Sequence, residues 1–69
     1  MEEYLNKWII YEFLGELNEA RVEEISPGRE FVKLHFLTGY EEWYEIGEIN
    51  IREELGTDGD RLDIWNDKL

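Results

Sequence analysis

Cysteine is absent from this 69-residue chain, and proline occurs only once. Without thiols the fold has no disulfide and no thiolate metal site, so packing alone must stabilise it. No apolar run approaches the roughly 20 residues that a membrane-spanning helix needs. The acidic first residues also lack the basic segment of a signal peptide. We therefore expect a soluble, cytoplasmic protein without a membrane partner.

Positive charge is scarce as well. Seven Lys and Arg residues face 18 Asp and Glu residues, which gives a formal net charge of -11. A field of this sign repels phosphate backbones and anionic membranes, so we do not expect direct nucleic-acid binding. Three explanations remain for the acidic surface: a basic protein or peptide partner, mimicry of a nucleic acid, or simple solubility.

The length allows one small domain, which buries only about 60% of the surface of its unfolded chain. Large side chains must compensate, and the chain is 42% hydrophobic and 14% aromatic. The segment Thr57-Asp58-Gly59-Asp60 has the character of a linker, so we divide the chain into a domain, residues 1–56, and an acidic C-terminal tail, residues 57–69. Trp65 in this tail either docks on the domain or contacts a partner.

Apolar and polar residues alternate in several short segments, which is typical of half-buried strands. We predict strands near residues 7–14, 20–25, 30–37, 41–46 and 49–51. The expected connections are a loop at 15–19, turns at Ser26-Pro27-Gly28 and Thr38-Gly39, a single 3₁₀ turn at Gly47-Glu48, and a linker at 57–60, with a bulge or strand end near Glu23-Glu24. Inward positions would be Ile9, Tyr11 and Phe13 in the first strand and Val32, Leu34 and Phe36 in the third. These signals predict an all-β fold, a five-stranded antiparallel SH3-like barrel.

The order of these segments resembles that of Tudor and chromo-barrel domains. The resemblance covers about Trp8 to Leu55. It is carried by an Ala-x-Val-x-x-Ile pattern at 20–25, a Val-x-Leu-x-Phe pattern at 32–36, the glycine at 39, Glu42-Trp43, and the closing Ile51-Arg52.

In such domains an aromatic cage can hold a methylated lysine or arginine by cation–π attraction, assisted by an acidic residue. The resemblance therefore implies a binding site whose residues we can name. The same rings also suit the wall of a barrel, since adjacent strand residues such as Trp43 and Tyr44 must point to opposite faces. The candidates are Tyr11, Phe13, Tyr40 and Trp43 as aromatic walls, with Glu41 or Glu42 as the anion.

Features of an enzyme are missing from the sequence. His35 is the only histidine, and Ser26 precedes a proline in a turn with no visible base to activate it. Asp58, Asp60 and Asp63 lack the further ligands of a calcium-binding loop. We predict a protein that is not an enzyme and has no cofactor or metal.

The sequence thus favours a non-enzymatic module that binds a basic protein or peptide at an aromatic and acidic surface. Electrostatic steering would speed such an association and make it sensitive to salt. The alternative is an acidic nucleic-acid mimic that inhibits a DNA-binding protein. A third interpretation is a structural element that forms oligomers through an exposed strand edge or the tail.

Overall fold

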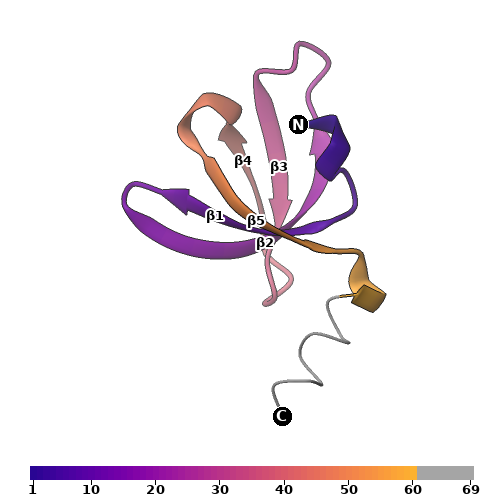
Figure 1. Ribbon diagram of the computed structural model, residues 1–69. Coiled ribbons are helices and arrows are strands. Elements are labelled where there is room, and N and C mark those ends of the chain that lie inside the picture. Colours follow the sequence, from indigo (N-terminus) through magenta and orange to yellow (C-terminus); the bar gives the residue numbers. More distant parts are fainter. Residues whose placement is uncertain (61–69) are drawn as a thin grey trace.

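The computed structural model describes residues 1–60, which form one antiparallel sheet with the strand order β4-β3-β2-β1-β5 (Figure 1). The all-β prediction is confirmed. Strands β4 and β5 occupy the two edges and do not pair with each other, so the sheet is not closed and the barrel stays a prediction. The elements are η1 (Glu2–Tyr4), β1 (Trp8–Phe13), β2 (Glu16–Ile25), β3 (Phe31–His35), β4 (Glu41–Glu45), η2 (Ile46–Glu48) and β5 (Asn50–Gly56).

The core lies on the concave face of this strongly curled sheet (Figure 1). Alternate residues of β1, β2 and β3 point into it, as the period of two predicts. Phe13 and Phe36, which we also expected inside, are only partly buried and pack against this core. The buried cluster contains Ile9, Tyr11, Ala20, Val22, Val32, Leu34 and Ile49.

The first hairpin turns earlier than the sequence analysis predicts. Leu14 and Gly15 have φ values of 51° and 81°, so both lie in the left-handed region, as in a two-residue type I′ turn. The register then continues from Phe13↔Glu16 without a break. The loop expected at residues 15–19 was therefore wrong, because the chain reverses at Leu14 and Gly15 and residues 16–19 already belong to β2.

The remaining connections between the strands follow the prediction. The pairing of β2 with β3 shifts between Val22 and Glu24, which places a bulge close to the expected position. Gly39 has a φ of 90° in the turn before β4. A single 3₁₀ turn, η2, follows β4 as predicted.

Strand β5 is longer than the expected segment 49–51, because it continues to Gly56 alongside β1. The segment that follows is attached to the sheet through Asp58. Its carboxylate accepts hydrogen bonds from Trp8 Nε1 at 2.6 Å and from the guanidinium of Arg21 at 3.1 and 3.2 Å.

Within residues 1–60 no helix combines the length and the apolar character that crossing a membrane requires. Residues 61–69, including Trp65 and Asp63, lie outside the described part of the chain.

Candidate functional site

A hollow of about 460 Å³ follows edge strand β4. Its walls come from both faces of the strand, because neighbouring residues such as Trp43 and Tyr44 point in opposite directions and both line it. The hollow therefore wraps around the strand and is not confined to one side of the sheet. It is lined by Phe13, Phe31, Glu42, Trp43, Tyr44, Glu45 and Glu48.

The core side of the hollow is built around Tyr44. Its ring meets those of Phe13, Tyr11 and Phe36 edge to face, with centroid separations of 5.0, 6.3 and 6.3 Å. The Tyr44 hydroxyl donates a hydrogen bond of 3.1 Å to Glu42 Oε2. Burial and this carboxylate raise the pKa of Tyr44. Tyr44 is thus held in place by packing on one side and a polar contact on the other.

The opposite face of β4 presents Trp43, a residue that is 45% exposed. The Lys33 ammonium lies 5.9 Å from the centroid of this ring and 3.6 Å from Glu41 Oε1. Glu41 Oε2 also accepts a hydrogen bond of 2.9 Å from His35 Nδ1. The hydrogen bond from His35, with the nearby Lys33, lowers the pKa of Glu41. Glu41 is therefore already engaged by cationic and polar groups of β3.

The structure separates the six site residues that the sequence suggested. Phe13, Glu42 and Trp43 line the hollow together. Tyr11 is buried beneath them, and burial raises its pKa.

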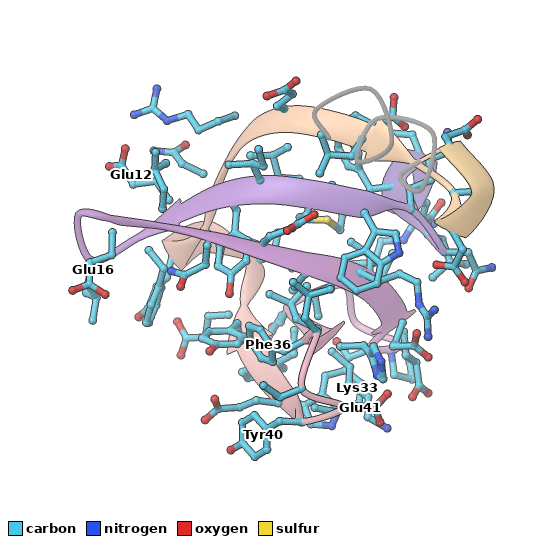
Figure 2. All side chains as sticks on the ribbon, turned by 90° about the horizontal axis from the view of Figure 1, so that it is seen from below. Glu12, Glu16, Lys33, Phe36, Tyr40 and Glu41 are labelled. Atoms are coloured by element: carbon cyan, nitrogen blue, oxygen red, sulfur yellow. The ribbon has the colours of Figure 1, made fainter. Side chains whose placement is uncertain are left out.

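Tyr40 and Glu41 do not line the hollow. Tyr40 stacks on Phe36 with ring centroids 6.0 Å apart and is 59% exposed. Figure 2 shows this pair, and Lys33 beside Glu41. The structure thus assembles half of the suggested residues around one feature.

Four residues of the hollow were not among the sequence-based candidates: Phe31, Tyr44, Glu45 and Glu48. The position of Phe31 could have been found from the sequence. A hairpin that turns at Gly39 pairs Phe31 with Glu45, which places Phe31 beside the end of β4. Glu48 lies in the expected 3₁₀ turn η2, but no local pattern indicates that this turn lines the hollow.

The basic side chains of residues 1–60 are already paired with acidic side chains outside the hollow. The five Lys and Arg residues of the range 1–60 each form an ion pair with a carboxylate. In the same range Glu42, Glu45 and Glu48 form none, so the hollow keeps uncompensated negative charge. The pairs are Lys7–Glu54, Arg21–Glu23, Arg21–Asp58, Arg29–Glu2, Lys33–Glu41 and Arg52–Glu12.

One group of side chains has the geometry of a metal-ligand set. Glu23, His35 and Glu41 offer ligand atoms that all lie within 4.8 Å of one another. Both carboxylates already have cationic partners, Arg21 at 2.5 Å from Glu23 and Lys33 at 3.6 Å from Glu41. A metal ion would have to displace these contacts.

No family model, no curated protein and no solved structure matches this chain. The function is therefore inferred from the geometry and the charge of the molecule.

Proposed function

We propose that this protein is a non-enzymatic module that binds a basic segment of a protein partner in the hollow of β4. We also propose that its sheet is an open form of the small SH3-like and Tudor-like barrels that the sequence resembles. The fold proposal is supported by the meander of β1 to β4, with β5 added beside β1. It is also supported by the long bulged β2, which pairs with both β1 and β3, and by the strong curl of the sheet.

One observation carries the functional proposal: aromatic rings and uncompensated carboxylates line the same hollow. Exposed aromatic faces attract ammonium and guanidinium groups by cation–π interaction. Glu42 and Glu45 add opposite charge at the same place, and neither forms an ion pair within residues 1–60. Lys33 above Trp43 is an intramolecular example of this contact.

The aromatic residues favour peptide binding over mimicry of a nucleic acid. A phosphate-mimicking surface needs carboxylates at intervals but has no need for rings among them. Here Trp43 and Phe31 remain exposed beside the acids, which suits a ligand that has both charged and apolar groups.

A titration of the ¹⁵N-labelled protein with a short Lys- and Arg-containing peptide tests this proposal. We expect amide shifts at Trp43, Tyr44 and Glu45, and an affinity that falls as salt is added because exposed charges are screened. Trp43→Thr should weaken binding, and Leu37→Thr is the matched control because Leu37 is an exposed apolar residue outside the hollow. Shifts confined to other strands, or equal binding of a Glu-rich peptide, would contradict the proposal.

A further inference from the structure

The outer edge of β4 has backbone groups that no strand of the described chain pairs with. Phe36 N–H donates to Tyr40 O at 2.8 Å, and Ile46 N–H donates to Glu30 O at 2.9 Å, at the two ends of the β3–β4 ladder. Hydrogen-bonded pairs alternate along an antiparallel ladder. Even-numbered residues of β4 therefore direct their N–H and C=O groups toward β3. Those of Glu41, Trp43 and Glu45 point outward.

This edge is also regular. Pairing with β3 runs from His35↔Glu41 to Phe31↔Glu45 without a register shift. An undistorted edge strand is a template on which another strand can form hydrogen bonds. Main-chain bonds then supply affinity, and contacts with alternate side chains supply specificity.

A second copy of the chain is a poor occupant of this edge. Antiparallel pairing of two β4 strands about Trp43 would place Glu41 of each copy directly opposite Glu45 of the other. Like charges opposite one another destabilise a sheet. The negative charge thus disfavours self-pairing and favours a strand of opposite charge.

We propose that the basic partner segment binds as an added antiparallel strand along the outer edge of β4. This proposal rests on the proposed function and specifies how the ligand lies. Outward backbone groups of Glu41, Trp43 and Glu45 would exchange hydrogen bonds with the segment. Its side chains would enter the hollow, which wraps around the same edge.

The register sets the pattern of the ligand. A residue opposite Glu45 is followed three positions later by the residue opposite Glu42, because the strands run in opposite directions. Basic side chains at these two positions would meet the carboxylates that have no ion pair. The two positions between them face Tyr44 and Trp43, so apolar or aromatic side chains fit there. The expected motif is basic–apolar–aromatic–basic.

The test uses the blocked peptide Thr-Lys-Val-Tyr-Arg-Thr and two versions of it with one N-methyl group each. In the proposed register the peptide tyrosine lies opposite Trp43 and its N–H donates to β4. The N–H of the peptide valine points away from β4. N-methylation of the tyrosine should therefore weaken binding by at least about tenfold, since a hydrogen bond is lost and the methyl group meets the strand. N-methylation of the valine is the matched control and should change the affinity less than about threefold.

Hydrogen exchange and two charge variants complete the test. Binding should slow amide exchange at Glu41, Trp43 and Glu45. Glu45→Gln should weaken binding several-fold, whereas Glu53→Gln, on the other edge of the sheet, should not.

Each result decides between the proposals. Equal losses for the two methylated peptides, with the hollow still shifted in the spectrum, would overturn strand addition and leave the proposed function intact. No binding of the unmodified peptide, or of other basic peptides, would overturn both. Protection of these three amides before peptide is added, in a dimeric sample, would show that a second copy occupies the edge.

Discussion

The two edges of the sheet differ in regularity and in how their charges are paired. Strand β4 pairs with β3 in an unbroken register, whereas the register between β5 and β1 shifts twice, between Trp8 and Ile9 and again between Ile10 and Tyr11. The acids also differ. Glu54 on β5 pairs with Lys7 at 3.0 Å, but Glu45 on β4 has no cationic partner within residues 1–60.

These differences indicate which edge of the sheet is better suited to accept a partner strand. Register shifts twist an edge strand, so that another strand cannot easily form hydrogen bonds along it. Strand β5 is protected in this way, and it also carries one cation, Arg52, whose guanidinium pairs with Glu12 of β1. Strand β4 has no register shift and carries no Lys or Arg, although its Glu41 pairs with Lys33 of β3. Its negative charge should disfavour pairing with a second copy. The proposed binding is therefore placed at β4, and β5 is proposed to have a structural role.

The largest effect is expected from Leu34→Ala, which tests how far β4 depends on its single neighbour. Leu34 is fully buried in β3, so the cavity should destabilise the protein by about 2–5 kcal/mol. Urea unfolding measures the loss, and amide exchange at Glu42 and Tyr44 shows whether β4 detaches first. Leu37→Ala is the control, since that side chain is 58% exposed and should cost less than about 0.5 kcal/mol. Similar losses for the two variants would contradict the packing argument.

Charge reversal at Glu45 should convert β4 into an edge that pairs with itself. In Glu45→Lys, each introduced lysine would lie opposite Glu41 of the second copy, so repulsion becomes attraction. We expect concentration-dependent dimers in sedimentation equilibrium at micromolar to millimolar protein.

Glu53→Lys gives the same change of charge on β5 and serves as the control. Its register shifts should keep that edge from pairing, so the variant should remain in the oligomeric state of the parent protein. Dimers of both variants would show that net charge, and not the β4 edge, controls association.

Removal of the Asp58 carboxylate tests what secures the β5 side of the sheet. Asp58→Ala takes acceptors away from Trp8 Nε1 and Arg21 at the end of β5. We expect a loss of about 1 kcal/mol, because the carboxylate is largely exposed and its interactions are screened. Unfolding followed by tryptophan fluorescence measures the loss, and amides of β5 should exchange faster than those of β4. Equal acceleration on both edges would argue against a local role.

Much of the fold could be predicted because strand alternation is a local property of the sequence. Val32 and Leu34 are buried where the pattern placed them, and the bulge near Glu24 follows from a break in the same pattern. The first hairpin could not be placed, since nothing local indicates that Leu14 accepts a positive φ. The extent of β5 depends on its pairing with a distant segment, β1, and so it also escaped prediction.

The candidate site was predictable only in part for a related reason. Of the consecutive residues Tyr40 to Trp43, only Glu42 and Trp43 line the hollow. Tyr40 stacks on Phe36, whereas Trp43 lines the hollow together with Phe31 and Glu45. Which residues line the hollow depends on the register of the strands and on which strand lies at the edge of the sheet. Both are long-range properties of the fold.

The smallest change in stability is expected from the side-chain contact between Glu41 of β4 and His35 of β3. The hydrogen bond from His35 lowers the pKa of Glu41 in the folded protein. A lowered pKa means that this contact stabilises the fold above the pKa of the unfolded chain. The stabilisation is lost as the pH falls through the folded value. His35→Phe keeps a ring near Trp8 but removes the donor, so the pKa of Glu41 should rise toward the usual value for glutamate.

A ¹³C titration of the Glu41 carboxyl group in both proteins measures this shift directly. The difference in stability between them should be largest near neutral pH and should shrink in acid. An unchanged midpoint in His35→Phe would mean that Lys33 alone sets the pKa of Glu41. The side-chain contact between the two strands would then be the Lys33–Glu41 ion pair, which added salt weakens. The attachment of β4 to β3 would then come mainly from the backbone hydrogen bonds between the two strands.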